Sequence, residues 1–590
     1  TQAGTGQYTT FSLGGSSADS AVGKKSDGSL NANPNPGTLT DVTDSSASGS
    51  AWATGTKTYN NAVDVDINGN PQLNLIELAK AKGKATGNVT TAEIQDATPA
   101  VLESHSTERS CYGPQGKTDG TSNDASKRCL VNQLKENGGI GSISEQLLDT
   151  RADVTIGGGS KYFRQTVQGG EYKGKTVWEQ AKEMGYQIVE NDPAAMNALQ
   201  YKDGQPVLAL MSDGNMPTKF NPSKATAKDP AKDANPTVCT PNASWLGNQD
   251  SSLKDMTKKA LDLLNANPNG QKNGYFLQVE GASIDKQDHA ANACGQIGET
   301  DDFDQAISYA LKTVDLKDTL VIVTADHAHT SQIVSAQPAY ALSTVLKTAD
   351  GNNMVVSYGT AAEDFRDDEG GYNGGDMSHT GTQLRIAASG PGAQRVIGLT
   401  DQTDNFYTIA GALGLATTAD QQKVLSSDAK VEVAAQKDSE DGKNVKYVAS
   451  ASGFNGDAVL SYELKDKNGN VLGQSDSSTP VSGVRVKTAQ TTSIALDKVS
   501  EGSEYTLTVT GRQSGKQVSF DFQAPSAGAA DRNDGVKSDA NGVIASGKVN
   551  NNPKADGPLG STGTTISFIA LAIAMLVAGA MVIKTGKNSR

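Results

Sequence analysis

The hydrophobic pattern changes once along the chain, and this change predicts two domains of different fold class. Up to about residue 415, short apolar runs rich in β-branched residues alternate with stretches of helical pattern. Two such runs are Tyr275–Glu280 and Leu320–Thr324, and a capping-box pair, Ser142 and Glu145, marks the start of one helix. This alternation predicts an α/β domain over residues 1–417, with a mainly parallel central sheet and helices on both faces.

From about residue 429 the apolar residues recur at every second position, as in Val431 and Val433. This period is typical of half-buried strands, and turn sequences separate the runs. Residues 429–525 therefore predict a small β-sandwich that resembles immunoglobulin-like surface modules. Residues 526–558 contain almost nothing apolar, so they cannot offset chain entropy by burial, and we expect a flexible linker there.

Residues 559–590 have the pattern of a surface anchor. Ile566 to Ile583 form an unbroken, weakly polar to apolar stretch that is long enough to span a bilayer, and basic residues follow it. Ahead of it, Leu559–Gly563 resembles the sortase sorting signal, although Gly560 stands where that pattern has proline. We expect a transmembrane tail that leaves the protein in the membrane or, after cleavage at Thr562, joined to the cell wall. Either outcome places it at the extracellular surface.

Charge and cysteine content indicate an exported protein that does not bind nucleic acid. The formal net charge is −14, and nothing in such a chain would neutralise a row of phosphates. The cysteines are four in number and lack the C-x-x-C spacing of zinc or redox motifs, so we expect disulfides. Of the three pairings that four cysteines allow, proximity in sequence favours Cys111 with Cys129, which leaves Cys239 with Cys294.

Three of the five histidines lie beside carboxylates at the spacing of metal ligands. Asp285 and His289 are one helical turn apart, so both can reach one ion. Asp326 and His327 follow an apolar run directly, at the edge where α/β enzymes bind ligands. His379 lies in a Gly-rich loop that can bend toward them. Mixed carboxylate and imidazole sets suit zinc, and two of them predict a multi-metal site for phosphoryl transfer.

Thr43 to Gly55 is a run of very small residues at a predicted helix start. Small side chains let a substrate and metal ions approach the backbone. Ser45 lies in the first turn, where free amides and the positive end of the helix dipole favour a phosphate group. The alternative is an ordinary Ser-rich helix cap, and the metal-ligand pattern elsewhere favours the phosphate site.

Several long segments resemble the signature segments of bacterial alkaline phosphatases. They are Asp44–Ala47, Trp52–Gly55, Gln95–Pro99, Val279–His289 and Thr324–His329. The match runs in order from about Gly4 to Leu415 with no large gap. The resemblance implies a homodimer that hydrolyses many phosphate monoesters at a site with two zinc ions and one magnesium ion.

The resemblance also implies roles for single residues. Ser45 would be the nucleophile that becomes phosphoserine, and Arg109 would hold the phosphate oxygens with its planar fork. Asp96 and Lys286 would lie outside the magnesium site and tune it and the phosphate site, and His329 would be a supporting neighbour. The implied ligands are Asp285, His289 and His379 for the first zinc, Asp326 and His327 for the second, and Glu280 and Thr98 for magnesium.

The start of the chain departs from this family. The family has an early apolar strand that ends in an Asp bridging the second zinc and magnesium, and nothing before Thr9 supplies either. The sequence begins at Thr1, and no initiator Met or signal peptide is visible in it. We therefore expect that an N-terminal segment is missing, that the sheet lacks a strand, and that the chain as written holds its second metal ion weakly and has little activity.

Two other functions fit parts of the sequence. A phosphodiesterase or sulfatase shares the broad fold class, but Arg109 favours a monoester dianion and Ser45 lies in no C/S-x-P-x-R segment. A β-sandwich and a surface anchor also fit an adhesion protein with an inactive phosphatase domain. Turnover of p-nitrophenyl phosphate distinguishes these alternatives.

Overall fold

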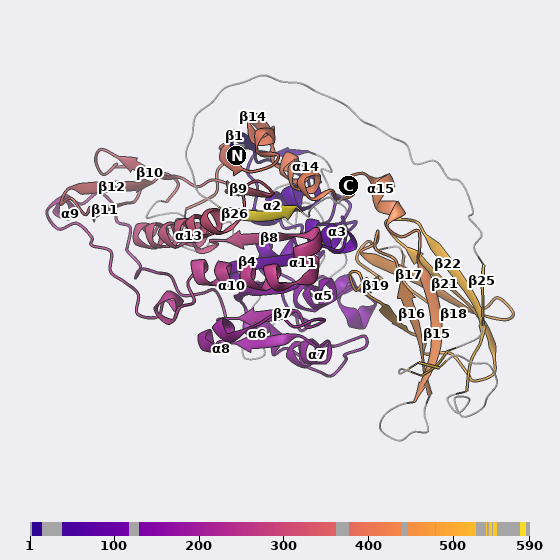
Figure 1. Cartoon of the computed structure of the whole chain (residues 1–590). Helices are drawn as coiled ribbons and strands as arrows, with labels where there is room; N and C mark the ends of the chain where they lie inside the picture. The colour runs from indigo at the N-terminus through magenta and orange to yellow at the C-terminus, as the bar shows by residue number, and fades with distance from the viewer. Residues whose placement is uncertain are drawn as a thin grey trace.

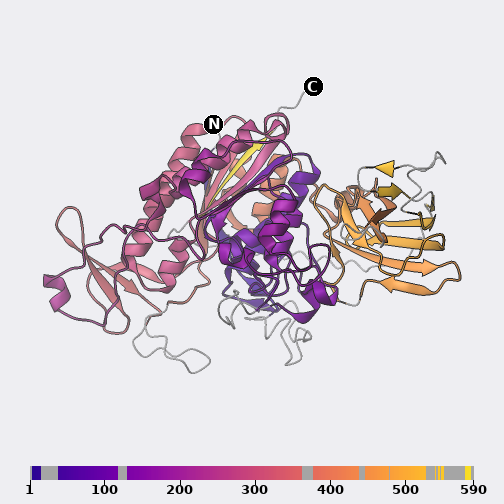
Figure 2. The ribbon, with the colours of Figure 1, turned by 90° about the horizontal axis from the view of Figure 1, so that it is seen from below.

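The computed structural model describes residues 3–14, 38–116, 129–361, 377–437, 445–477 and 479–526, and the backbone of strands at 538–539, 542–544, 547–550 and 579–585. Three regions lie side by side in this part of the chain (Figure 1, Figure 2). A large α/β region is central, a small three-stranded sheet projects on one side of it, and two further β-sheets lie on the other.

The central sheet has ten strands in the order β14-β1-β13-β9-β26-β8-β4-β5-β7-β6. The neighbours β8, β4, β5, β7 and β6 run parallel to one another, which confirms the predicted α/β fold with a parallel central sheet. The bounds are β1 Ala3–Thr9, β4 Ala85–Glu93, β5 Val154–Gly158, β6 Gln187–Glu190, β7 Val207–Leu210, β8 Gly274–Glu280, β9 Thr319–Thr324, β13 Leu384–Ser389, β14 Gly398–Asp401 and β26 Gly579–Thr585.

Helices cover both faces of this sheet, and neighbouring residues of one strand pack on opposite faces. In β9, Leu320 and Ile322 join a cluster with residues of α2, α3 and α14, whereas Val321 joins a cluster with residues of α10 and α13. Burial on both faces requires a continuous apolar run, as in β9. The helices are α2 Ser45–Thr54, α3 Leu75–Ala81, α4 Ala97–Ala100, α5 Ile143–Thr150, α6 Ser160–Phe163, α7 Val177–Glu183, α8 Pro193–Ala198, α9 Ala231–Ala234, α10 Leu253–Ala266, α11 Pro268–Asn273, α12 Ser283–His289, α13 Ala293–Thr313, α14 Gln402–Leu413 and α15 Ala419–Val424.

The projecting sheet is formed by β10 (Ser331–Val334), β12 (Asn353–Tyr358) and β11 (Ser343–Lys347). A disulfide between Cys239 and Cys294 ties the chain beside this sheet to the start of α13. The second disulfide joins Cys111 and Cys129. Both predicted pairings are confirmed. Two short strands, β2 (Ser12–Leu13) and β3 (Leu39–Thr40), pair antiparallel with each other.

Two antiparallel sheets form what we call the C-terminal β-module, the described residues from 430 to 523. They share an apolar core that includes Val433, Leu507 and Phe520, so the predicted period-two strands are present. The strands are β15 Lys430–Lys437, β16 Val445–Ser452, β17 Val459–Asp466, β18 Val471–Gln474, β19 Val484–Arg485, β20 Thr492–Ala495, β21 Glu504–Gly511 and β22 Gln517–Gln523.

Residues 526–558 differ in part from the flexible linker that we expected. Three short strands, β23 (Ser538–Asp539), β24 (Gly542–Ile544) and β25 (Gly547–Asn550), extend the two sheets of the C-terminal β-module. Strands β15 and β22 offer open backbone edges, and pairing with such an edge does not require an apolar sequence. The rest of this stretch lies outside the described residues.

The C-terminal tail also differs from the expectation. Among the described residues no helix is long and apolar enough to cross a membrane. Residues 579–585, which overlap the predicted transmembrane stretch, form β26 and pair antiparallel with β8 and β9. The facing edges of β8 and β9 satisfy the backbone groups of β26, so the sheet that we expected to lack a strand is continuous. The sorting-signal-like Leu559–Gly563, with Thr562, lies outside the described residues.

The packing at the sheet generates a prediction on stability. Glu103 is fully buried, where it accepts hydrogen bonds from Asn88 Nδ2 at 2.8 Å and Thr155 Oγ1 at 3.1 Å. Burial raises its pKa to about 8. Between about pH 5 and 8 the unfolded chain ionises this carboxyl and the folded chain does not, so stability falls as the pH rises. Glu103→Gln removes this titration, and its melting temperature should fall less over that range than that of the wild type. The control is Glu136→Gln, because Glu136 is exposed. If the melting temperature of Glu103→Gln fell with pH as much as that of the wild type, Glu103 would not be neutral in the folded chain.

Candidate active site

Ser45 is the first residue of α2, and Asp44 caps this helix. The Asp44 side chain accepts a hydrogen bond from Ala47 N at 2.9 Å. All residues of α2 after Ser45 are buried, and apart from Trp52 and Thr54 they are Ser, Ala and Gly. The hydroxyl of Ser45 lies 2.9 Å from His327 Nε2. The serine therefore combines the free amides of a helix N-terminus with a neighbouring imidazole.

Arg109 is held beside this helix by two carboxylates. Its Nη1 donates to Asp44 Oδ2 at 3.1 Å and its Nη2 donates to Asp96 Oδ1 at 2.9 Å. The second oxygen of Asp96 accepts from Lys286 Nζ at 2.5 Å. Burial opposes the charge of both basic groups, but the adjacent carboxylates raise the pKa of Arg109 and of Lys286 above their usual ranges. Two fixed positive charges thus lie close together, Arg109 beside the start of α2 and Lys286 within α12.

Four side chains converge on one point beyond the carboxyl ends of β8 and β9. Asp285 and His289 come from α12, His329 from the loop after β9, and His379 from the chain before β13. One ligand atom from each lies within 4.8 Å of the others. Burial opposes ionisation of Asp285, but hydrogen bonds and charge interactions with the surrounding histidines lower its pKa well below the usual range. The cluster therefore has an anionic centre.

The hydrogen bonds of this cluster fit a bound cation. His289 Nδ1 lies 2.7 Å from the Met377 carbonyl oxygen, and His379 Nδ1 lies 2.9 Å from that of Thr43. Both Nδ1 atoms therefore carry hydrogen, so in a neutral ring each Nε2 presents a lone pair. The two Nε2 atoms are only 2.9 Å apart. Facing lone pairs repel unless a proton or a metal ion lies between them, and carboxylate with imidazole is a donor set that suits zinc.

A second pair of donors lies next to this cluster. Asp326 Oδ2 and His327 Nε2 are 3.3 Å apart, and the ring of His327 stacks on that of His379 with centroids 3.6 Å apart. Burial lowers the pKa of His327 to about 4, so the ring is neutral at pH 7, the form that binds metal ions. Ser48, one turn after Ser45, donates to Asp326 Oδ2 at 3.2 Å.

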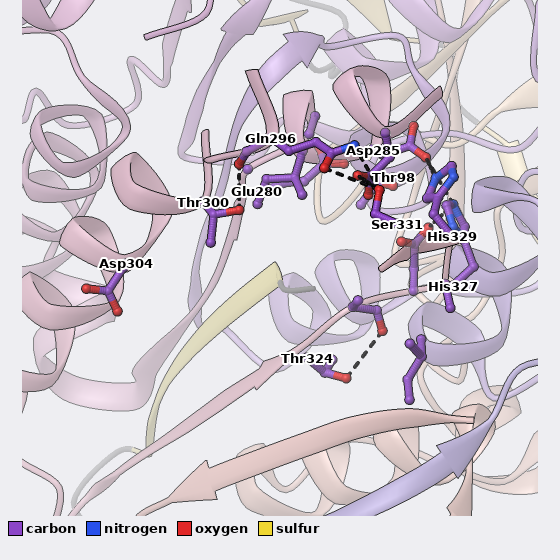
Figure 3. Close-up of a pocket in the computed structure, with 18 of the residues that line it drawn as sticks. Thr98, Glu280, Asp285, Gln296, Thr300, Asp304, Thr324, His327, His329 and Ser331 are labelled. Atoms are coloured by element: carbon purple, nitrogen blue, oxygen red, sulfur yellow. Dashed lines mark hydrogen bonds and ion pairs between the residues drawn. The ribbon is translucent and has the colours of Figure 1, made fainter. Parts of the chain in front are cut away.

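Glu280 and Thr98 line a cavity together with Asp285, His327 and His329 (Figure 3). The cavity has a volume of about 1040 Å³ and lies between the carboxyl ends of β8 and β9 and the helix α13. Glu280 Oε2 accepts from Thr90 Oγ1 at 2.5 Å, and burial raises the pKa of Glu280 to about 8. A cation beside it would favour its ionised form, so the donor set fits a hard ion such as magnesium.

The structure brings the predicted residues to one edge of the sheet. Three contacts were missed in the sequence: the Thr90 hydroxyl on Glu280, the Ser48 hydroxyl on Asp326, and the Thr43 carbonyl oxygen on His379. Thr90 could have been found as a polar residue within a strand that is buried along its whole length. Ser48 lies three residues after Ser45, on the same face of a helix. No sequence signal identifies a backbone carbonyl group.

Comparison with known proteins agrees with this geometry. A family model described as alkaline phosphatase matches residues 20–415. The chain belongs to the alkaline phosphatase family. It is thus a metal-dependent enzyme of a family that hydrolyses phosphate monoesters.

Curated relatives are similar over most of their length. The alkaline phosphatase of Escherichia fergusonii is 49% identical over 414 residues, which cover 70% of this chain and 78% of that protein. The alkaline phosphatase of Escherichia coli (strain K12) is 52% identical over 379 residues, covering 63% and 74%. The streptomycin-6-phosphate phosphatase of Streptomyces griseus is 41% identical over 384 residues, covering 63% and 79%.

Among solved structures, the alkaline phosphatase from the Antarctic bacterium TAB5 is 23% identical, with a TM-score of 0.45, and the match covers 70% of this chain and 89% of that one. This likeness is too distant to support an argument about the site of this alkaline phosphatase.

The four-residue cluster generates a prediction on metal binding. Asp285→Asn removes the anionic centre, so the affinity of the full chain for zinc should fall by more than about tenfold, the loss seen even for outer partners of metal ligands. Isothermal titration with zinc and the shift of the melting temperature on adding zinc measure this without reference to activity. Asp304→Asn is the matched control, because Asp304 lines the same cavity but lies on α13, away from the histidines (Figure 3). Equal zinc affinity in both variants would show that the cluster is not a metal site.

Proposed function

We propose that this alkaline phosphatase hydrolyses phosphate monoesters through a phosphoserine intermediate on Ser45. The observation that carries the proposal is the position of Ser45 Oγ, at the N-terminus of α2, 2.9 Å from His327 Nε2 and next to the Asp44 that holds Arg109. A hydroxyl in this place has amide groups, an arginine and metal-ligand side chains around it. That set suits a nucleophile that attacks phosphorus.

Arg109 binds two non-bridging oxygens of the phosphate group. Asp44 and Asp96 fix the plane of its guanidinium group, which leaves its orientation set before the substrate arrives. A monoester dianion offers more charged oxygens to this fork than a diester does, and this favours a phosphomonoesterase over a phosphodiesterase. Lys286, held by Asp96, adds a second positive charge near the same group.

Three metal ions complete the proposed site. Asp285, His289 and His379 would hold one zinc, Asp326 and His327 the second, and Glu280 and Thr98 a magnesium ion. His329, whose Nε2 lies 2.6 Å from Asp285 Oδ1, would orient that carboxylate. When bound, these ions supply positive charge that favours the ionised forms of the serine and of water and offsets charge on the leaving oxygen.

The reaction has two displacements at phosphorus. The Ser45 hydroxyl loses its proton, Ser45 Oγ forms a bond to phosphorus, and the bond between phosphorus and the ester oxygen breaks, so that an alcohol leaves after taking up a proton. Water then gives up a proton and attacks the phosphoserine, the bond between phosphorus and Ser45 Oγ breaks, Ser45 Oγ takes up a proton, and inorganic phosphate is released. Arg109 stays on the non-bridging oxygens in both steps, and the buried α2 holds Ser45 in line.

Other parts of the proposal rest on the sequence and the family alone. A homodimer follows from the family resemblance. A binding protein with an inactive catalytic region is the second candidate, and the charged residues that the chain retains around Ser45 favour the enzyme.

Replacing Ser45 tests the nucleophile. Ser45→Ala should abolish the phosphoenzyme and lower turnover of p-nitrophenyl phosphate by several orders of magnitude, because the two-step path loses its first bond. Mass spectrometry after acid quench of the metal-loaded full chain locates the phosphate. Ser48→Ala is the control, since Ser48 touches Asp326 but is not placed to attack, and it should still form the phosphoserine. Phosphate trapped on another residue would contradict the assignment.

Replacing Arg109 tests the phosphate clamp. Arg109→Ala should weaken the binding of inorganic phosphate and raise KM, while zinc and magnesium content stays at the wild-type level, because no metal is assigned to this residue. Calorimetry with phosphate and metal analysis by mass spectrometry measure both. Loss of zinc in this variant would mean that Arg109 supports the metal ligands rather than the substrate.

A further inference from the structure

A buried arginine joins the C-terminal β-module to the catalytic region. Arg485 ends β19 and is 3% exposed. Its Nη2 donates to Glu77 Oε1 at 2.5 Å and to Thr150 Oγ1 at 2.9 Å, both in the catalytic region. Its Nη1 donates to the carbonyl oxygens of Ala458 and Val486 in its own module, each at 3.1 Å. One guanidinium group thus binds both parts of the chain.

Glu77, the partner of Arg485, is a fully satisfied buried carboxylate. It also accepts from His105 Nε2 at 2.9 Å and from Asn74 N at 3.0 Å. Burial opposes its charge, but His105 and Arg485 outweigh burial and lower its pKa to about 2. Removing one partner of such a buried group leaves charge without compensation, so the geometry around Glu77 depends on Arg485.

His105 begins the segment that carries Arg109. Its Nδ1 lies 2.9 Å from the carbonyl oxygen of Asp64. Next to it, Val63 and Ser106 exchange two backbone hydrogen bonds of 2.8 Å, and Arg109 N donates to Asn61 O at 2.8 Å. Residues 105–109 and 61–64 therefore form a short ladder. His105 lies at one end of this ladder, and Arg109 lies at the other.

The same ladder is attached to the helix of the nucleophile at two points. Asp64 N donates to Ser50 Oγ in α2 at 2.8 Å, and Asn61 N donates to Asp44 Oδ2 at 2.9 Å. Asp44 is also the residue that accepts from Arg109. A shift of His105 would therefore be passed by direct hydrogen bonds to both Arg109 and α2.

The module is packed into the catalytic region around this contact. Gly483 N donates to Gly138 O at 2.8 Å, and Ile140 N donates to Val481 O at 3.0 Å. Val481 and Val459 belong to the same apolar cluster as Val63. Arg485 thus lies in a continuous core, where its position is fixed by the module.

We propose that Arg485 is a positioning residue for catalysis, through which the C-terminal β-module holds the ladder of residues 61–64 and 105–109 and so sets the place of Arg109. The proposal rests on the role of Arg109 as the phosphate clamp. It gives the module a function in the reaction itself, separate from any ligand or surface that it binds.

The test compares two substitutions at the same interface in the full, metal-loaded chain. Arg485→Met removes the buried contact with Glu77 and should raise the Kd of inorganic phosphate about fivefold or more, the lower end of typical coupling between sites. KM for p-nitrophenyl phosphate should rise with it, and zinc content should not change. Lys487→Met is the matched control, because Lys487 pairs across the interface at 3.0 Å with Glu171, whose side chain is 49% exposed, and not with Glu77. It should leave phosphate affinity unchanged.

A double-variant cycle decides how Arg485 acts. In an Arg109→Ala background, Arg485→Met should have no further effect on phosphate binding, because the group that it positions is gone. An additive effect, or a lower melting temperature with wild-type phosphate affinity, would overturn the proposal. If Arg109→Ala alone leaves phosphate binding unchanged, the role of Arg109 fails instead. Should Arg485→Met not fold, Arg485→Lys replaces it in the cycle, since one ammonium group cannot reach Glu77 and both carbonyl oxygens together.

Discussion

The carboxylate of Asp44 is the interaction on which the rest of the site depends. It caps α2 through Ala47 N, accepts the hydroxyl of Ser46, fixes the turn at Asn61 and holds Arg109. One side chain therefore sets the distance between the proposed nucleophile and the proposed phosphate clamp. A helix N-terminus and a guanidinium group compensate its charge, which offsets the cost of placing a carboxylate so close to the protein core.

Much of the fold and of the candidate site could be predicted from the sequence, because patterns within short stretches of the chain indicate them. The apolar run of β9 predicts a strand buried on both faces, and Asp285 with His289 predicts a shared face of a helix; both are present. Ser142 and Glu145 form the capping box that their spacing predicts. The disulfide between Cys111 and Cys129 also follows from proximity in sequence. In each case a few neighbouring residues determine the outcome.

The features that could not be predicted depend on contacts between distant residues. Residues 579–583 have the composition of a membrane segment, yet in the described structure they form β26, because β8 and β9 present two open edges that satisfy a backbone of almost any apolar sequence. The strands at 538–550 pair with open edges in the same way. Glu77 and Arg485 are 408 residues apart, and nothing in either local sequence marks them as partners. Hydropathy and period describe what a segment can bury, and the neighbouring elements decide where it is buried.

The contact between Arg485 and Glu77 shows why such a distant pair matters physically. Taking two charges out of water costs several kcal/mol for each ion, so a buried pair is not an efficient way to stabilise a fold. What it does impose is geometry, since any displacement of the module separates charges that water cannot reach. An apolar interface would tolerate sliding, whereas this one ties the two regions at a single point beside the ladder that ends at Arg109. An arginine that clamps a phosphate, the role proposed for Arg109, needs its place fixed more than it needs a more stable fold, and this interface would supply that constraint from outside the catalytic sheet.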